Sequence, residues 1–379
     1  MFSVLLIACF AAFLFSVFLC RQIRYFAPYW GLVDHPGERK IHTKPIPTGG
    51  GLGIGLSVLL TFALCQLCLI LIMHTEMLQS LFPALFPTVF QTVFPEVVLV
   101  HLNGVVYRSR PLWILLGLGG VLLLLGTIDD RYNLSWIFRF GVQIVVAIIV
   151  VSCGWRLTVF INAPILTNVL SVIWIVGLVN SFNMLDNMNG LSAGIATICS
   201  VFLAVVMFIT PNPLSLQPQF FVAGFLFVLV GALAGFLMYN NPFHASLFMG
   251  NGGAYFIGFL LATSTLTATF SGYDGMAHTV YVPLLILAVP VYDMTTVILI
   301  RIRNKKSPFV GDKNHFSHRL VDLGFSKTQA VLTVYLTTTI CCLGSLLLYQ
   351  VNFLGASLIF LQTLLLLFLI GIIEYVGRK

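Results

Sequence analysis

The sequence predicts an all-α polytopic membrane protein. Of its 379 residues, 59% are hydrophobic and only 8% are charged, whereas about 25% of the residues in a soluble domain are charged. Apolar runs of about 20 residues, the length that a helix needs to cross the hydrocarbon core, recur along the whole chain. These two observations exclude a soluble globular fold and predict a single membrane-embedded domain over residues 1–379.

Eleven apolar segments are candidates for membrane-spanning helices. They are residues 1–20, 49–73, 112–128, 136–153, 169–181, 191–210, 219–239, 252–270, 279–300, 328–349 and 352–374. The segment at 169–181 is short and runs into polar sequence at Asn180. We therefore expect about eleven transmembrane helices.

The orientation follows from the basic residues. Arg21 and Arg24 follow the first segment and no basic residue precedes it, which favours an uncleaved anchor with an external N-terminus over a signal peptide. Threading the chain from there places every lysine and arginine except Arg108, Arg110 and Arg156 on the cytoplasmic side. Because basic residues favour cytoplasmic loops, this bias supports the helix count and predicts a cytoplasmic C-terminus.

Two connections are unusual. Residues 77–111 contain the Phe-Pro repeats of "LFPALFPTVFQTVFP", which break any long helix and indicate an external insertion. Residues 301–327 form a cytoplasmic loop with two histidines in "GDKNHFSHRL". The net charge of +7 belongs to such cytoplasmic loops and the lipid beside them, so no nucleic-acid partner is expected. The Cys65-x-x-Cys68 pair has no second pair near it and indicates packing rather than metal or redox chemistry.

Polar clusters from distant parts of the chain fall on the cytoplasmic side of this topology. Aspartates follow the third segment, an Asn-rich stretch follows the fifth, Asn251 follows the seventh, Asp293 lies in the inner part of the ninth, and the histidine loop follows it. A solvated helix end or a capped turn explains each cluster alone. Their convergence on one face instead predicts a functional site there.

Carboxylates, histidines, lysines and glycines at one membrane face suit phosphoryl transfer. Mg²⁺ binds carboxylate oxygens and bridges substrate phosphates, and basic residues neutralise the remaining phosphate oxygens. Catalysis of such a transfer is mostly positioning and charge neutralisation. The chain has neither a Walker-type G-x-x-x-x-G-K-[ST] nor a strand-borne G-x-G-x-x-G, so a soluble nucleotide-binding fold does not supply this chemistry.

Five stretches carry a resemblance to a known family. They are "DHPGERKIHTKPIPTGGG" at 34–51, "GTIDDRYNLS" at 126–135, "NSFNMLDNMNGLSAG" at 180–194, "NNPFHASLFMGNGG" at 240–253 and "PFVGDKNHFSHRL" at 308–320. In this order they resemble the motifs of the polyprenyl-phosphate N-acetylhexosamine-1-phosphate transferases. That family includes the undecaprenyl-phosphate GlcNAc-1-phosphate transferases of the WecA and TagO type and the peptidoglycan translocase MraY.

The resemblance implies an activity and a location. A UDP-activated N-acetylhexosamine, by the form of the histidine loop UDP-GlcNAc, would give its sugar 1-phosphate to undecaprenyl phosphate and release UMP, as the first membrane step of a cell-envelope glycan pathway. The resemblance also implies Mg²⁺, or Mn²⁺ in its place, as the cofactor. It implies a multi-pass protein of the bacterial inner membrane with a cytoplasmic active site, and it is compatible with a homodimer.

The matching motifs assign roles to residues. The catalytic residues implied are Asp129, Asp130, Asp186, His315 and His318. The substrate-binding residues implied are Lys40, His42, Lys44, Asn180, Asn183, Asn189 and Arg319, with Arg319 as a diphosphate contact. The metal ligands implied are Asp129, Asp130, Asp186 and Asn251, and of the aspartate pair we expect Asp129 to take the proton.

Two positions depart from the family pattern and keep alternatives open. Asn189 and Asn251 stand where the family commonly has aspartates, and the aspartate at the second position is a metal ligand in the family. Asparagine keeps a carbonyl oxygen but removes a negative charge. A catalytically weakened or non-catalytic homologue is therefore one alternative, and an MraY-like phospho-MurNAc-pentapeptide transferase is another. A secondary transporter is disfavoured because its polar groups would lie near the midplane of the membrane.

Overall fold

The computed structural model describes residues 2–35, 45–73, 102–157, 163–210, 218–268, 270, 277–308 and 311–376. The helices are α1 (Phe2–Phe26), α2 (Gly50–Met73), α6 (Leu102–Tyr132), α7 (Trp136–Ser152), α8 (Pro164–Leu185), α9 (Leu191–Ile209), α10 (Phe220–Leu237), α11 (Gly250–Thr267), the 3₁₀ turn η1 (Ala277–Val280), α12 (Tyr281–Ile286), α13 (Ala288–Arg303), α14 (Phe316–Asp322), α15 (Lys327–Leu347) and α16 (Phe353–Val376).

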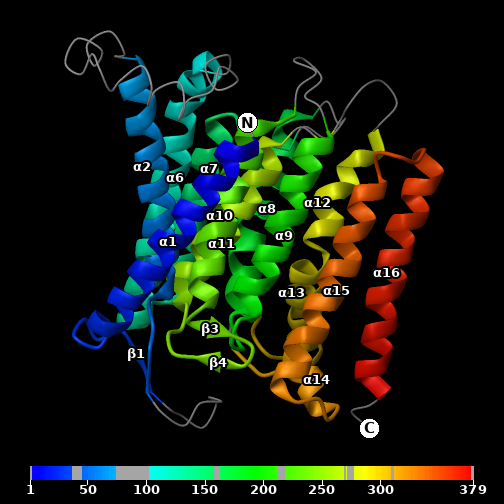
Figure 1. Cartoon of the computed structure of the whole chain (residues 1–379). Helices are drawn as coiled ribbons and strands as arrows, with labels where there is room; N and C mark the ends of the chain where they lie inside the picture. Colours follow the sequence, from blue (N-terminus) through cyan, green and yellow to red (C-terminus); the bar gives the residue numbers. More distant parts are fainter. Residues whose placement is uncertain are drawn as a thin grey trace.

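The long helices lie side by side in one bundle with a continuous apolar core (Figure 1). Two small antiparallel hairpins, β1 (Val33–Asp34) with β2 (Ile46–Pro47) and β3 (Asn240–Asn241) with β4 (His244–Ala245), lie at the lower end of the bundle in Figure 1. The short α14 lies at the same end, which we call the hairpin end. The first helix begins at the opposite end and the last helix finishes at the hairpin end.

The helices confirm a polytopic membrane fold. Among the described residues, 8 helices are long and apolar enough to cross a membrane, and 9 are if the bent pair α12 and α13 forms one span. The apolar helix α7 has 17 residues and is shorter than these. Each of the predicted apolar segments contains a helix among its described residues, while the count of eleven crossings and the orientation stay predictions.

Two predicted helix boundaries are wrong. The third helix begins at Leu102, so the end of the predicted insertion at 77–111 belongs to α6 and Pro111 lies inside that helix; residues 74–101 lie outside the described residues. A membrane helix tolerates proline because only one backbone hydrogen bond is lost and neighbours can compensate for it. At its other end α6 continues to Tyr132, which places Asp129 and Asp130 inside its last turn instead of after it.

The fifth helix is longer than predicted. α8 runs from Pro164 to Leu185, so Asn180 does not end it. The side-chain amide of Asn180 donates to Gln143 Oε1 of α7 at 2.6 Å and to the carbonyl of Val176 at 2.8 Å. Because these partners satisfy the amide inside the bundle, the helix can continue through a polar residue.

The ninth segment, predicted as one helix over 279–300, is bent. The helices before and after Leu287 are bent by 68° relative to each other. Pro290 has no N–H to bond the carbonyl of Ile286, and that carbonyl instead accepts from the thiol of Cys199 at 3.1 Å and of Cys342 at 3.6 Å. Two buried cysteines thus satisfy a carbonyl that Pro290 cannot bond.

Glycines bring α2, α6 and α11 close together at the hairpin end. A Cβ atom on Gly126 of α6 would overlap the backbone of Gly252 in α11, and one on Gly51 of α2 would overlap Gly253. The amides of Gly50 and Gly51 donate to the carbonyls of Phe248 and Met249, each at 2.8 Å. The first turns of α2 and α11 therefore lie beside the last turn of α6, which carries the aspartate pair.

Candidate active site

Asp129 is buried and both of its carboxylate oxygens are bonded. Oδ2 accepts from Arg139 Nη1 at 2.5 Å and from Asn251 Nδ2 at 2.7 Å. Oδ1 accepts from the backbone N–H of Leu134 at 2.8 Å. The guanidinium of Arg139 therefore compensates the charge of Asp129, and the amide of Asn251 is oriented by it.

Asp130 lies against the first turn of α11. Its Oδ1 accepts from the backbone N–H of Asn251 at 3.0 Å. Gly250, just before it, has a φ of +77°, and a Cβ atom there would overlap Asp130 Oδ2. Glycine is thus required twice at this position, for the left-handed backbone and for the approach of the carboxylate. The positive end of the helix dipole also favours an anion here.

Asp186 follows the last residue of α8 and faces the Asp130 carboxyl and the backbone of Gly250. Removal from water and the nearby charge of Asp130 raise the pKa of Asp186 to about 7, against an opposing effect of the Gly250 amide. Desolvation disfavours the charged form of a carboxylic acid, and a cation beside it would favour that form. Asp130 and Asp186 therefore make a pair of carboxyls that suits a shared positive charge.

Asn240 joins the two turns that carry Asp186 and Asn251. Its Oδ1 accepts from the backbone N–H of Gly190 at 2.5 Å, and its Nδ2 donates to the carbonyl of Leu247 at 2.8 Å. The hydroxyl of Tyr335 in α15 donates to the carbonyl of Gly190 at 2.5 Å. Asn240 was not among the predicted site residues, although it stands in one of the quoted motifs.

The histidine loop is held by a buried aspartate. Nδ1 of His315 lies 2.9 Å from Asp293 Oδ2, and the backbone N–H of Phe316 donates to Asp293 Oδ1 at 2.5 Å. Asp293 is fully buried. Because a carboxylate accepts, Nδ1 of His315 carries a proton and donates it to Asp293, so Nε2 is the ring nitrogen that faces away from this carboxylate.

His318 lies next to His315, with ring centroids 6.2 Å apart. Burial lowers the pKa of His318 below its usual 6.5, and His315 and Lys313 lower it further, against opposing effects of Asp322 and Asp293. His318 is therefore neutral at pH 7 and can both donate and accept a hydrogen bond.

One side-chain contact links the histidine loop to the aspartate region. Ser317 Oγ donates to Asn187 Oδ1 at 2.6 Å, and Asn187 Nδ2 donates to the carbonyl of Met184 at 2.8 Å. Asn187 directly follows Asp186 in the chain. The structure thus brings the turn of Asp186 together with α14, which begins next to His315 and carries His318.

Arg319 is buried, and each nitrogen of its guanidinium donates a hydrogen bond within the protein. Nε donates to Glu374 Oε2 at 2.8 Å, Nη1 to the carbonyl of Asn314 at 2.5 Å, and Nη2 to Thr296 Oγ1 at 3.1 Å. These contacts indicate a structural role. Its role as a diphosphate contact stays a prediction that they do not support.

The other predicted substrate contacts are dispersed. Asn180 pairs with Gln143, Asn183 lies in the last turn of α8, and Asn189 is exposed in the turn before α9. The basic residues predicted to hold the lipid phosphate lie outside the described residues; they are Lys40, His42 and Lys44.

The donors fit a divalent cation only in part. Within the described ranges, no group of three His, Cys, Asp or Glu side chains is arranged to hold a metal ion. Mg²⁺ commonly takes one or two carboxylates and completes its shell with water and substrate phosphate. Asp130, Asp186 and the Oδ1 atom of Asn251 fit that kind of site, whereas both oxygens of Asp129 already have partners.

The fold and the site define a helical membrane protein whose carboxylates, amides and histidines meet at one end of the bundle. Residues 112–269 match the family described as Glycosyl transferase family 4. The chain is 30% identical to the probable undecaprenyl-phosphate N-acetylglucosaminyl 1-phosphate transferase of Bacillus subtilis (strain 168) over 328 residues. These aligned residues cover 84% of this chain and 77% of that protein. The chain belongs to glycosyl transferase family 4, which confirms the family predicted from the motifs.

Two further relatives have the same kind of name. The undecaprenyl-phosphate alpha-N-acetylglucosaminyl 1-phosphate transferase of Escherichia coli (strain K12) is 26% identical over 377 residues, covering 95% of this chain and 88% of that protein. The decaprenyl-phosphate N-acetylglucosaminephosphotransferase of Mycolicibacterium smegmatis is 28% identical over 370 residues, covering 88% of this chain and 79% of that protein. The similarity therefore extends well beyond the matched core at 112–269.

Proposed function

We propose that this protein transfers GlcNAc-1-phosphate from UDP-GlcNAc to a polyprenyl phosphate and releases UMP. The names of the relatives support this activity. The observation that carries it for this chain is the meeting of Asp130, Asp186 and Asn251 at the first turn of α11. That arrangement suits an anionic diphosphate substrate and its counter-ion.

In the reaction, an oxygen of the lipid phosphate attacks the β-phosphorus of UDP-GlcNAc. The bond from that phosphorus to the bridging oxygen breaks, and UMP leaves with the electron pair. Mg²⁺, or Mn²⁺, held by Asp130, Asp186 and Asn251, would neutralise charge on the diphosphate. Neutral His318 can donate a hydrogen bond to a phosphate oxygen, and His315 can bond the substrate or UMP through its Nε2.

Asp129 acts in this scheme mainly as a positioning residue. Its contact with Nδ2 of Asn251 turns the amide so that Oδ1 is the remaining acceptor. Its contact with Arg139 keeps a positive charge beside the site. The proton role expected for Asp129 would require it to give up one of these partners.

The site faces the cytoplasm in the proposed topology of eleven crossings in the bacterial inner membrane. The bias of the basic residues supports this orientation. Arg108 lies near the start of α6 and Asp130 near its end, so about 33 Å of helix separates the external arginine from the carboxylate. The hairpins and α14 lie at one end of the bundle (Figure 1), and Asp130 bonds the first turn of α11, which follows β4 in the chain.

A catalytically weakened homologue is the second candidate, and Asn251 is the observation that favours it.

The test is the exchange of radiolabelled UMP into UDP-GlcNAc by membranes containing undecaprenyl phosphate, for the wild type, Asp130→Asn and Asn251→Asp. We expect exchange in the wild type and a loss of at least about 100-fold in Asp130→Asn. Absence of exchange in both the wild type and Asn251→Asp would refute the proposed transferase activity. Exchange only with UDP-MurNAc-pentapeptide would replace the proposed donor.

A further inference from the structure

The inner turns of α1 line a cavity that the proposed reaction does not use. Its volume is about 550 Å³, and its described lining consists of Arg21, Gln22, Arg24 and Tyr25. This lining has two positive charges, an amide, a phenol and no carboxylate. Such a set of groups suits an anion that carries further polar atoms.

The two arginines project from the same side of α1 because they are three residues apart. Arg24 Nη1 donates to Ser246 Oγ at 3.2 Å, and its guanidinium lies 5.8 Å from the ring centroid of Tyr239. These neutral groups orient Arg24 without cancelling its charge. Tyr239 is itself anchored to α1, since its hydroxyl donates to the carbonyl of Val17 at 2.9 Å.

Arg21 is exposed and makes no hydrogen bond or ion pair with any part of the chain that the structure describes. Three other arginines of the hairpin end have carboxylate partners. Arg139, Arg301 and Arg319 pair with Asp129, Asp312 and Glu374 respectively. The cavity thus holds two guanidinium groups with uncompensated charge.

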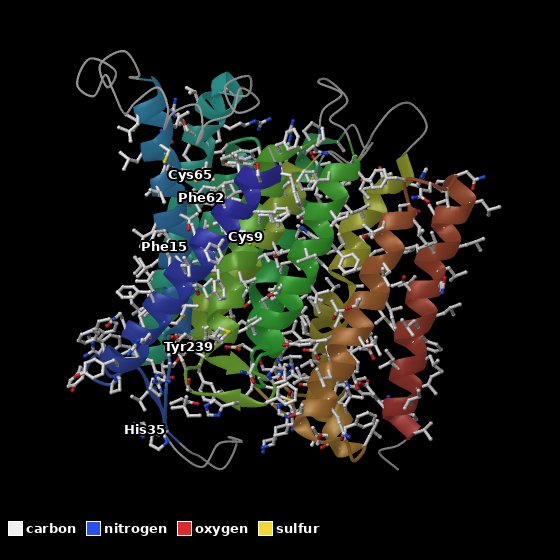
Figure 2. The ribbon with its side chains drawn as sticks, in the orientation of Figure 1. Cys9, Phe15, His35, Phe62, Cys65 and Tyr239 are labelled. Atoms are coloured by element: carbon white, nitrogen blue, oxygen red, sulfur yellow. The ribbon has the colours of Figure 1, made fainter. Side chains whose placement is uncertain are left out.

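Aromatic residues place this cavity at the level of the lipid headgroups. Tyr25, Phe26, Tyr29 and Trp30 are all exposed at the end of α1, and Phe26 stacks on Trp30 with ring centroids 6.0 Å apart. Rings of this kind favour the membrane–water interface. Arginines one turn deeper extend their side chains to the same level. Figure 2 shows Tyr239 and His35 at this end of the bundle and Cys9 farther along α1.

An apolar stripe leads from the cavity into the membrane. Phe10, Leu14 and Phe18 are exposed on α1, and the steps of three residues to Arg21 and four to Tyr25 keep these two residues on the same helical face. An acyl chain can therefore lie along α1 while the phosphate to which it is attached reaches the two arginines.

We propose that this cavity binds the headgroup of an anionic phospholipid of the surrounding leaflet. The phosphate accepts hydrogen bonds from Arg21 and Arg24, which two guanidinium groups can give in a forked geometry. The amide of Gln22 and the hydroxyl of Tyr25 bond the remaining headgroup oxygens. The site is separate from the aspartates and does not depend on the proposed reaction.

The test is native mass spectrometry of the whole protein titrated with phosphatidylglycerol, phosphatidylethanolamine and undecaprenyl phosphate. We expect phosphatidylglycerol to bind more tightly than phosphatidylethanolamine. The double variant Arg21→Gln/Arg24→Gln should bind phosphatidylglycerol about 25-fold more weakly, because each arginine contributes about five-fold. The matched control is Arg303→Gln/Lys306→Gln, which removes the same charge from exposed residues at the same end and should leave the affinity unchanged.

Three results would overturn the proposal. They are an equal loss of affinity in the control variant, no preference for phosphatidylglycerol over phosphatidylethanolamine, and displacement of phosphatidylglycerol by undecaprenyl phosphate at equal concentration. The last result would assign the cavity to the acceptor lipid. If the double variant does not fold, Arg21→Gln alone decides the question, because Arg21 has no hydrogen bond or ion pair within the described structure to lose, and a loss of about five-fold is expected.

Discussion

Nε of Arg319 donates to Oε2 of Glu374 at 2.8 Å and joins the helix of the histidine loop to the last helix of the bundle. Both residues are buried, with 2% and 5% of their surfaces exposed. The hydroxyl of Tyr292 donates to the same carboxylate oxygen at 3.2 Å. Most of α16 otherwise faces outward, so this pair fixes the end of α16 against α14.

Replacement of Glu374 with glutamine should destabilise the protein and slow the exchange reaction. It leaves the guanidinium of Arg319 buried without a counter-charge, which costs about 3 to 5 kcal/mol. A lower unfolding temperature in detergent and a lower exchange rate are the expected measurements. Glu374→Asp retains the negative charge, so its unfolding temperature and its exchange rate should fall less than those of Glu374→Gln. An unfolding temperature equal to that of the wild type would show that the ion pair contributes nothing to the fold.

The contact between Arg139 and Asp129 predicts a coupled pair of substitutions. Arg139→Gln leaves the buried carboxylate of Asp129 without its positive partner. Asp129→Asn leaves the guanidinium of Arg139 without its negative partner. Each change alone should lower the free energy of unfolding by more than about 1 kcal/mol, and the double variant should recover part of the loss. Thermal or denaturant unfolding of the four proteins measures the coupling. Strictly additive effects would contradict a direct interaction.

Several features of this site could be predicted from the sequence because they depend on residue type and order. Asp129, Asp130, Asp186 and Asn251 stand in recognisable motifs, and the bias of the basic residues placed those motifs at one face. The structure agrees by bringing Asp130, Asp186 and Asn251 together. Local sequence was sufficient here because each residue lies at a helix end whose position is set by the length of an apolar run.

The contacts between residues of different helices could not be predicted in the same way. Glu374 lies 55 positions from Arg319, and nothing in the apolar sequence around it indicates that it meets the histidine loop. At the bend near Leu287, thiols from α9 and α15 bond the carbonyl of Ile286. Such contacts depend on how helices pack, and packing is not visible in the periodicity of one chain segment.

Asn251→Asp should make the protein depend more strongly on a divalent cation. Nδ2 of Asn251 lies 2.7 Å from Asp129 Oδ2, so a carboxylate at this position would face another carboxylate; two unit charges 4 Å apart interact by about 4 kcal/mol at an effective dielectric of 20. A cation relieves that repulsion. We expect a lower unfolding temperature in EDTA, a larger stabilisation by Mg²⁺ than in the wild type, and half-maximal exchange at a lower Mg²⁺ concentration.

The isosteric change Asn251→Leu is the control for this substitution, because it removes the amide without adding charge. It should lose the contact with Asp129 and gain no stabilisation by Mg²⁺. Equal stabilisation of the wild type and Asn251→Asp by Mg²⁺ would place the cation away from residue 251.

The lowered pKa of His318 predicts the acid limb of the pH profile. Burial, His315 and Lys313 all disfavour its protonation, so protons bind more readily in the unfolded chain. The folded state therefore keeps this contribution to stability above about pH 6.5 and loses it as the pH falls below that value. If neutral His318 contacts substrate, exchange should decline in the same range.

Lys313→Gln removes one of the charges that lower this pKa and should move the decline to higher pH. Arg303→Gln removes an equal charge that does not affect His318 and should leave the profile in place. Identical shifts in the two variants would indicate a general effect of net charge and would remove His318 from the explanation.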